Sequence, residues 1–395
     1  MAKEREILEV DVVFVGAGPA SLAGAIRLMQ LQDAHNRRVA ETGNGEKKEL
    51  LVAVLEKSSG IGRHNLSGAI LDPRSMDELM PDWKGQGAPI EGTVGSHEVR
   101  YLFKRWSLKA PITPPPLANK GYPIVSISRF TEWMGKKAEA MGANLFDHFP
   151  AKEFIWDGET VAGVRCQDRG LDKAGNQKEN YEPGAEIKAR VTVLAEGTRG
   201  SLTKELVGKK NLLQGKNPQG YALGIKEVWR VAPKNHRPGH VSHTMGFPLG
   251  LDTFGGGFVY HMNDSQVALG LVISLDYRDP LMDPYEAMQR FKTHPFIKRL
   301  LEGGERVAYG AKTIPEGGYY ALPSLVTDGC LIIGDAAGFV NAQRIKGLHL
   351  AIKSGMAAAE ATWEALEEES CTRGSLARYE KKMMESWAAK EMRRV

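Results

Sequence analysis

DVVFVGAGPASLAG, residues 11–24 of a 395-residue chain, decides the fold class. It opens with a short apolar run, rich in β-branched residues, of the kind that a buried parallel strand needs. Gly16 then allows a tight turn. Gly18 leaves room for a pyrophosphate at the start of a helix, whose free N–H groups and dipole attract anions. The stretch predicts a dinucleotide-binding strand, turn and helix, with these residues around the phosphates: Gly16, Ala17, Gly18, Pro19, Ala20 and Ser21.

Glu56 is the acidic residue expected to accompany this turn, because it closes a second apolar strand at residues 51–55. Its carboxylate can accept hydrogen bonds from ribose hydroxyls, and Lys57 follows it. The usual gap is about 20 residues, and a polar excursion at residues 32–49, after a helix expected over 20–31, lengthens it here. A carboxylate at this place disfavours a phosphorylated ribose, so the pattern indicates FAD or NAD. A solvated charge at the strand end is the alternative interpretation.

The composition is that of an ordinary globular protein, with 42% hydrophobic residues, 25% charged residues and a formal net charge of +4. This mild charge does not indicate nucleic acid. No stretch reaches the apolar length of a membrane span. The N-terminus MAKEREILEV has neither the apolar core of a signal peptide nor the pattern of a transit peptide, so a cytoplasmic location is expected.

Metal and thiol chemistry find little support in the sequence. Cys166, Cys330 and Cys371 are too few for a four-thiolate iron–sulfur site and too scattered for a redox pair, so buried structural thiols are expected. His236 and His243 flank a third histidine, but no acidic or thiol ligand is close to them. No metal site is predicted.

Three more segments in the first half of the chain carry candidate cofactor contacts. The glycine- and serine-rich residues 57–70 suit a loop whose backbone closes over a ligand. Arg129, at the end of a strand expected over residues 125–128, could reach a phosphate or stand as a surface charge; a cation at a helix N-terminus needs some other partner. Glu196 and Gly197 end a buried strand where many flavoproteins return to the cofactor, but NADPH-dependent monooxygenases usually have Asp-Gly there. In the loop at residues 57–70, the tightest point is Ser67, Gly68 and Ala69.

Short alternating strands at residues 144–149, 151–156 and 160–166 predict a small antiparallel meander. From residue 220 the pattern changes to antiparallel strands separated by proline and glycine clusters, as expected of a substrate domain. Its most suggestive piece is Phe254 followed by Gly255, Gly256 and a third glycine. Consecutive glycines expose backbone N–H and C=O groups to a planar ligand. A β-bulge is the alternative interpretation.

The chain then returns to the first domain at residues 329–338, GCLIIGDAAG, a buried strand that ends at Gly334 and Asp335. An aspartate at this place suits the ribitol chain of a flavin. Lys346, Gly347 and Leu348 precede a helix expected over residues 350–369. Its N-terminus would point at the pyrimidine edge of an isoalloxazine, where a positive dipole stabilises negative charge. This second turn and helix favour FAD over NAD.

Along almost its whole length the chain resembles the electron transfer flavoprotein–ubiquinone oxidoreductases. The stretches that carry the resemblance include VGAGPASL, HNLSGAILDP, VLAEGTRGSL, FGGGFVYH and RIKGLHLAIKSGMAAAE, in this order. The resemblance implies an FAD enzyme on a membrane that takes electrons from electron transfer flavoprotein and reduces ubiquinone, without a nucleophile or an acid–base side chain. Gly255 and Gly256 would offer backbone groups to the quinone, with Phe254 where the family tends to have tyrosine. The resemblance assigns FAD binding to Gly16, Gly18, Glu56, Ser67, Gly68, Gly334, Asp335 and Gly347.

Two departures from the family stand out. Its polypeptide continues into a ferredoxin-like region with a cysteine-bound four-iron cluster, whereas this chain stops at residue 395 in what looks like mid-helix. We therefore expect a truncated chain, a separate iron–sulfur protein, or direct entry of electrons into the flavin. Residues 101–122, with aromatic and basic residues before a run of prolines, are more basic than the family's apolar membrane plug. Such residues are expected either to contact the boundary between lipid headgroups and acyl chains, or to form a proline-stiffened segment that packs on the protein itself.

The expected fold is α/β, α+β overall: a Rossmann-like FAD-binding domain of the glutathione reductase type with an inserted antiparallel-sheet quinone domain. The expected location is the cytoplasmic side of a membrane, as a peripheral protein. Two alternative functions stay open, an FAD-dependent reductase of isoprenoid double bonds (geranylgeranyl reductase-like) and an electron-carrier subunit without turnover of its own. The expected division is an FAD domain at 1–100, 123–206 and 322–371, a membrane-surface segment at 101–122, a quinone domain at 207–321 and a C-terminal helix at 372–395.

Overall fold

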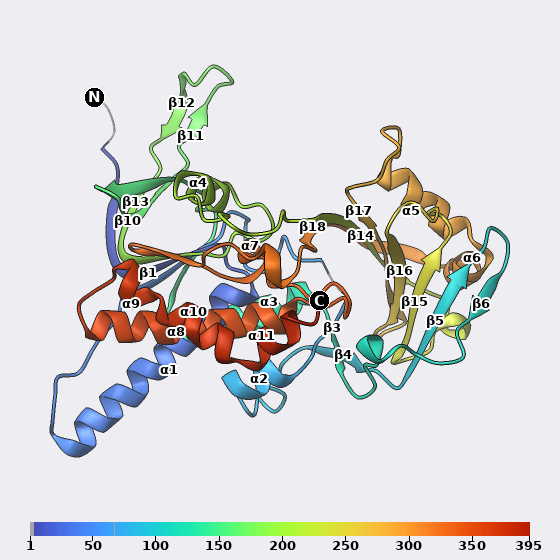
Figure 1. Cartoon of the computed structure of the whole chain (residues 1–395), viewed down its shortest axis with the longest axis horizontal. Helices are drawn as coiled ribbons and strands as arrows, with labels where there is room; N and C mark the ends of the chain where they lie inside the picture. Colours follow the sequence, from blue (N-terminus) through green and yellow to red (C-terminus); the bar gives the residue numbers. More distant parts are fainter. Residues whose placement is uncertain (1–3, 67) are drawn as a thin grey trace.

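The computed structural model describes residues 4–66 and 68–395. It has two lobes side by side along the longest axis, the first rich in helices and the second built on a long sheet (Figure 1). Strand β1 (Ile7–Val15) lies in the first lobe between two parallel neighbours, and its last four residues are buried. The apolar run of the opening motif forms this strand because a strand covered on both faces can be apolar throughout.

The sheet of the first lobe is parallel in its centre, with an antiparallel hairpin attached to β13. Its order from edge to edge is β19 (Val326–Thr327), β20 (Cys330–Ile332), β13 (Glu186–Leu194), β1, β2 (Val52–Leu55) and β8 (Asn144–Phe146), and β10 (Thr160–Cys166) joins β9 (Ala151–Asp157) to β13. Two smaller sheets accompany it: β3 (Ala69–Ile70), β7 (Pro123–Val125) and β4 (Ile90–Thr93) form one, and the projecting hairpin β11 (Arg169–Leu171) and β12 (Gln177–Glu182) forms the other.

Helices α1 (Pro19–Thr42) and α8 (Leu348–Glu367) pack closely against each other. Glycine permits this approach, since a Cβ atom at Gly355 would stand 2.0 Å from the Ala20 carbonyl oxygen. The start of α1 is thereby fixed against α8 at Gly355, inside the second helix. The other helices of this lobe are α2 (Arg74–Leu79), α3 (Ile127–Ala140), α4 (Ser201–Lys209), α7 (Gly334–Ala337), α9 (Arg373–Leu376), α10 (Arg378–Glu385) and α11 (Trp387–Met392), with short 3-10 turns at Pro115–Leu117 (η1) and Tyr319–Ala321 (η3).

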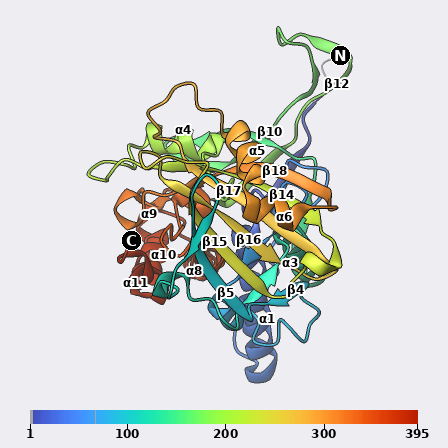
Figure 2. The same cartoon turned by 90° about the vertical axis from the view of Figure 1, so that its right-hand side faces the viewer.

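The second lobe is a mostly antiparallel sheet that Figure 2 shows from its outer side. Helices α5 (Pro284–Thr293) and α6 (Pro295–Leu301) cover the outer face through Phe291 and Ile297. Its inner face packs Ala268 and other apolar residues against Ile70 and Ile124 of the first lobe. Its strands, in order, are β18 (Glu305–Pro315), β14 (Tyr221–Arg230), β17 (Gln266–Ser274), β16 (Gly255–His261), β15 (His240–Gly246), β5 (Ser96–Leu102) and β6 (Ser107–Lys109), and η2 (Pro233–Asn235) links β14 to β15.

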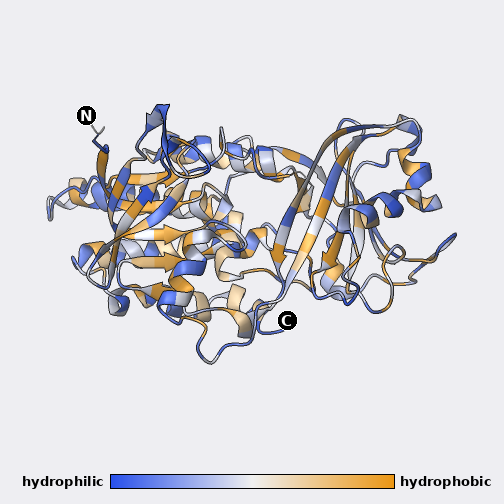
Figure 3. Cartoon of the chain, turned by 90° about the horizontal axis from the view of Figure 1, so that it is seen from above, coloured by the Kyte–Doolittle hydropathy of each residue, from blue (hydrophilic) through white to orange (hydrophobic). Residues whose placement is uncertain are grey.

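The structure corrects one domain boundary. Residues 96–100 were expected in the FAD domain and residues 101–122 as a separate segment, but β5 pairs in parallel with β15 and β6 pairs with β5 at the sheet edge. The prolines that follow β6 end the pairing because they cannot donate to a sheet. Hydrophobic residues occur in the strands of both lobes (Figure 3). Strand β17, in the middle of the second sheet, is apolar from Val267 to Ile273 apart from Gly270, as a strand covered on both faces is.

Three further expectations about secondary structure were wrong. Residues 32–42 continue helix α1 instead of forming a loop, and the helix ends at Gly43 in the left-handed conformation with φ 69°. Residues 372–395 form α9, α10 and α11 rather than a single helix, because Ser386 stops one helix and its side chain caps the next. Asn144–Phe146 pairs in parallel with β2 instead of opening an antiparallel meander.

Candidate functional site

The turn between β1 and α1 contains two glycines, and the fold itself requires glycine at only one of them. Gly16 has φ 96°, and a Cβ atom there would lie 2.6 Å from the Ala195 carbonyl oxygen. Gly18 has φ −80°, and a Cβ atom there would meet nothing within 4 Å. The helix begins at Pro19 without a side-chain cap and without an acidic residue in its first turn. The open space and the uncapped helix end fit a phosphate group.

Glu56 stands beside this turn at the end of β2, as predicted. Its two carboxylate oxygens accept hydrogen bonds from the backbone N–H groups of Ala17 (3.2 Å) and Ser58 (2.8 Å). Each oxygen has a second lone pair, so the half-buried carboxylate can still accept the hydroxyls of a ribose. Lys57 follows as an exposed residue.

The second glycine motif lies next to the first, although about three hundred residues separate them in sequence. A Cβ atom at Gly334 would stand 3.0 Å from the Cβ of Ala20, and one at Gly347 would lie 3.6 Å from an Asp335 carboxylate oxygen. Burial raises the pKa of Asp335, and the charge of Lys312 on the second sheet opposes that shift. Helix α8 begins at Leu348, again without a side-chain cap and without an acidic residue in its first turn. The two turns, each next to a helix start without a side-chain cap, therefore lie side by side.

Lys346 is buried immediately before the second of these helix ends. Its ammonium donates hydrogen bonds to the side-chain oxygen of Asn119 (2.7 Å) and the carbonyl of Arg344 (3.2 Å). Burial lowers its pKa to about 7, helped by the charge of Arg344 and opposed by two carboxylates. A lysine that changes charge near neutral pH thus lies where the flavin end of the cofactor is expected.

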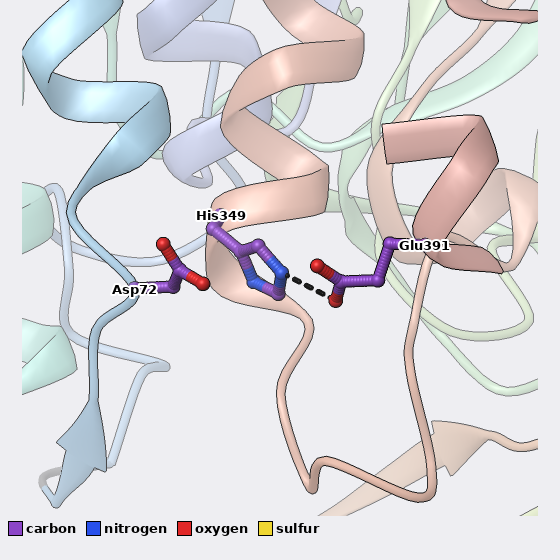
Figure 4. Close-up of side chains that lie close together, drawn as sticks. All are labelled: Asp72, His349 and Glu391. Atoms are coloured by element: carbon purple, nitrogen blue, oxygen red, sulfur yellow. Dashed lines mark hydrogen bonds and ion pairs between the residues drawn. The ribbon is translucent and has the colours of Figure 1, made fainter. Parts of the chain in front are cut away.

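A buried ion-pair network next to α8 went unpredicted. Asp72 accepts hydrogen bonds from Arg74 (2.7 Å) and Arg344 (3.0 Å), and Glu391 accepts them from Arg344 (2.7 Å) and from His349 (2.9 Å, dashed in Figure 4). Burial acts to raise the pKa of Glu391, but the hydrogen bond from His349 and the arginine charges outweigh it and lower the pKa to about 2.

The same three side chains have the residue types of a metal site. Carboxylate and imidazole atoms of Asp72, His349 and Glu391 lie within 4.8 Å of one another. Two arginines already neutralise both carboxylates, so their charges stand where a cation would have to bind. The cluster is accordingly an ion-pair network that ties α11 to the start of α8. Its members are far apart in sequence and follow no motif, which is why sequence reasoning missed them.

Two side chains that were predicted to contact the cofactor interact with protein groups in the structure. Arg129 lies in the first turn of α3 and forms an ion pair with Glu91 (2.7 Å), the partner that its place at a helix N-terminus requires. The Glu196 carboxylate accepts hydrogen bonds from the backbone N–H (2.7 Å) and hydroxyl (2.8 Å) of Thr203 in the first turn of α4. The backbone of Glu196 still lies against Gly16. Contacts of Arg129, Glu196 and Gly197 with a cofactor stay predictions.

The loop at Gly68 reaches the second lobe. Ser67 lies outside the described residues, but a Cβ atom at Gly68 would stand 2.2 Å from the Cβ of Ala268. The carbonyl of Gly68, just before Ala69, accepts a hydrogen bond from the ammonium of Lys226 (3.3 Å). Burial lowers the pKa of Lys226 to about 8. Sequence reasoning missed this lysine, although its place between small and apolar residues of β14 was a signal.

The glycine run opens strand β16. A Cβ atom would stand 2.3 Å from the Val272 carbonyl oxygen at Gly255, and 2.4 Å from the Thr244 carbonyl oxygen at Gly256. Strand packing by itself therefore requires glycine at both positions. Phe254 before them is 69% exposed, so it lies at the surface at this end of the sheet. A quinone at this place stays a prediction.

Comparison with known proteins shows the family. The chain is 40% identical to a probable electron transfer flavoprotein–ubiquinone oxidoreductase of Acinetobacter baylyi, over 99% of this chain and 70% of that protein. The chain belongs to this family. It is 44% identical to the mitochondrial member of Arabidopsis thaliana and 42% identical to the human one, in each case over 98% of its length. It spans 59% and 63% of those two relatives, about three fifths of their length.

A family model described as the ubiquinone-binding part of these oxidoreductases matches residues 221–314, from β14 to β18. Among solved structures, a geranylgeranyl bacteriochlorophyll reductase-like protein from Thermoplasma acidophilum has a TM-score of 0.71 at 17% identity, over 98% of this chain and 86% of that one. A flavin-dependent brominase has a TM-score of 0.63 at 18% identity, over 94% and 83%. At such identities the likeness concerns the fold alone, and it confirms the predicted fold class.

The thiols fit structural roles. Cys166 and Cys330 are buried, and burial raises the pKa of each, that of Cys166 to about 11. Cys371 is half-buried. Within the described part of the chain, no cysteine belongs to a group of metal-ligand side chains. The three thiols do not fit a four-thiolate cluster. Across residues 4–66 and 68–395, no helix combines the length and apolar character that crossing a bilayer requires.

Proposed function

We propose that this chain binds FAD and passes electrons from reduced electron transfer flavoprotein to ubiquinone at a membrane surface. The observation that carries the proposal is an arrangement of two parts. The sheet that matches the ubiquinone-binding family model packs its inner face against the first lobe, where Gly68 is in contact with Ala268. Lys312 of the same sheet is close enough to act on the charge of Asp335 in the second dinucleotide-type turn. A flavin held at the dinucleotide-type turns and a quinone held on the second sheet would therefore lie on the same interior face of the protein.

The residues around the two turns fit FAD. The uncapped start of α1 and the open space at Gly18 would take the pyrophosphate, Glu56 the adenosine ribose, and Asp335 the ribitol. The start of α8 and the ammonium of Lys346 would lie at the pyrimidine edge, where positive charge favours reduction. When bound, FAD supplies the two-electron chemistry, and these side chains position it and tune its potential.

The end of the second sheet that carries the glycine run has the character of a membrane-contacting surface. The strand register places the ends of β5, β15 and β17 and the start of β16 at this one end. Large apolar side chains are exposed in the connections there, including Leu251 (95%), Leu281 (88%) and Trp106 (57%), beside the basic residues Lys104 and Arg105. Such a mixture suits the boundary between lipid headgroups and acyl chains. We propose peripheral attachment here, on the cytoplasmic side, with ubiquinone reaching Phe254, Gly255 and Gly256 from the lipid.

The decisive experiment follows the flavin spectrum of purified, FAD-loaded protein. Reduced electron transfer flavoprotein should bleach the flavin absorbance, and a short-chain ubiquinone should restore it. A flavin that stays oxidised with the protein donor refutes the proposal. A flavin that accepts electrons but ignores quinone, in a protein that copurifies with an iron–sulfur partner, would instead identify an electron-carrier subunit. Reduction of prenyl double bonds would identify the isoprenoid reductase.

A further inference from the structure

Two histidines and a tyrosine form a hydrogen-bonded row on the inner face of the second sheet. Nε2 of His97 lies 2.7 Å from Nδ1 of His243, and Nε2 of His243 lies 3.0 Å from the hydroxyl of Tyr260. The three residues come from the neighbouring strands β5, β15 and β16. His97 is half-buried, whereas His243 and Tyr260 are each only 4% exposed. No motif of the sequence accounts for this row.

Each member of the row can donate one hydrogen bond and accept another near neutral pH. Burial is the main cause that lowers the pKa of His97 to about 4 and of His243 to about 3, and the charge of Lys346 adds to both shifts. His240 lowers the pKa of His97 further, whereas Glu98 and the Leu117 carbonyl raise it. Burial raises the pKa of Tyr260, so its phenol keeps its proton.

A row of neutral imidazoles and a phenol can point its hydrogen bonds in either of two directions. In one, the Tyr260 hydroxyl donates to His243 and His243 donates to His97. In the other, His97 donates to His243 and His243 donates to Tyr260. The change from one direction to the other moves one proton along the row and leaves every member neutral. The geometry is that of a proton conduit.

The two ends of the row meet different surroundings. At the outer end, part of the His97 side chain is accessible to solvent, whereas its Nδ1 atom is buried and the Leu117 carbonyl acts on the ring. The side-chain nitrogen of Asn119, whose oxygen binds Lys346, is buried without a hydrogen-bond partner among the described residues. At the inner end, a Cβ atom at Gly68 would stand 4.0 Å from the Tyr260 ring. The row therefore runs from a partly exposed histidine to a buried tyrosine, whose ring lies against the loop expected beside the flavin.

The row also lies toward the end of the sheet opposite the glycine run. β5 and β15 begin, and β16 ends, at that opposite end. Reduction of ubiquinone to ubiquinol consumes two electrons and two protons. An apolar end in contact with lipid cannot supply the protons, so they have to come from the aqueous end of the molecule.

We propose that His97, His243 and Tyr260 form a relay that carries protons from water at the start of β5 to the buried face beside Gly68. The inference rests on the proposed function, in which the donor flavoprotein supplies the electrons and water supplies the protons. Each group that passes a proton inward regains one from the group outside it. After one transfer the row points in the opposite direction, so the imidazole tautomers and the Tyr260 hydroxyl must be reset before a second proton follows.

The test measures proton uptake when the FAD-loaded protein is reduced by flash photoreduction in weak buffer without oxygen. Full reduction of bound FAD takes up at least one proton with two electrons, which a pH-indicator dye reports while the flavin absorbance reports the electrons. In the unchanged protein, the two signals should coincide. Tyr260→Phe keeps the ring stacked on Phe258 (centroids 4.6 Å apart) but removes the hydroxyl. It should slow proton uptake by about 100-fold, the lower end of the usual range for a positioned proton-transfer group.

His243→Gln should slow proton uptake by a similar factor. His236→Gln is the matched control, because His236 lies at the same end of the sheet and binds the Met262 carbonyl outside the row. It should leave proton uptake unchanged. If His243→Gln fails to fold or to bind FAD, Tyr260→Phe decides the question.

Proton uptake at the unchanged rate in Tyr260→Phe would overturn the relay. The measurement uses neither electron transfer flavoprotein nor quinone, so the proposed function can fail while the relay stands, and the relay can fail while the proposed function stands.

Discussion

Replacement of Gly18 by alanine separates the demands of the fold from those of the cofactor. Gly18 lies at the N-cap of α1 with φ −80° and ψ 174°, which alanine adopts freely, and its Cβ atom would meet no protein atom within 4 Å. A Gly to Ala change at a compatible position stabilises by about 0.4–1 kcal/mol through the unfolded chain. Alanine is a poorer N-cap than glycine by a similar amount. The two effects should cancel to within about 0.5 kcal/mol.

The same change should weaken FAD binding, because the added methyl group fills the space expected for the pyrophosphate. Loss of one hydrogen bond to a charged group costs about 1.5–3 kcal/mol, which corresponds to a rise in Kd of about 10- to 150-fold. Gly16→Ala is the matched comparison. Its φ of 96° and its approach to the Ala195 carbonyl oxygen (2.6 Å) should cost the apoprotein about 2 kcal/mol or more.

Urea unfolding of the two apoproteins and fluorescence titration with FAD measure these quantities. Gly18→Ala should match the unchanged protein in urea and bind FAD weakly, whereas Gly16→Ala should already unfold earlier in urea. Either of two results contradicts this reasoning: a Gly18→Ala apoprotein as unstable as the Gly16→Ala one, or a Gly18→Ala protein with unchanged affinity for FAD.

Three further predictions concern acid stability, membranes and the ribose. The folded pKa of Glu391, about 2, lies below its ordinary value of 4.5, so its contribution of up to about 3 kcal/mol is present above pH 4.5 and lost as pH falls toward 2. Urea unfolding across that pH range should show this loss, and Glu391→Gln should lack it. Leu251→Ser should weaken flotation with anionic liposomes by about tenfold or more, whereas Val307→Ser, at the opposite end of the sheet, should not. Glu56→Ala removes the acceptor of the Ala17 N–H group and should raise the Kd for FAD about tenfold, as measured by flavin fluorescence.

The parts of the site that neighbours in sequence determine were predictable. The turn at Gly16 and Gly18 follows from consecutive residues, and Glu56 follows from the end of the next apolar strand. The pairing of this motif with Gly334 was also within reach, since both have the same strand–turn–helix pattern and the structure brings them together at Ala20. Neighbouring residues in the sequence determine these turns, and the backbone dihedral angles and helix starts in the structure agree with that prediction.

The parts that depend on distant contacts were not predictable. His243 was considered with His236 because of their spacing, but its hydrogen-bond partner is His97 from a strand far away in sequence. Asp72 and Glu391 likewise meet only because α11 folds back on α8. The alternating residues of β5 indicate a strand, but no local pattern tells which of two sheets a strand will join.

The place of β5 in the second sheet has a consequence for how the protein is made. β5 leaves the ribosome long before β15, the strand that it pairs with, so it must wait unpaired while the intervening chain is synthesised. A fragment limited to residues 221–314 would lack β5 and expose the edge of β15, which invites aggregation. The second lobe is therefore completed by an early piece of the chain, and biosynthesis of the two lobes cannot be separated into consecutive steps.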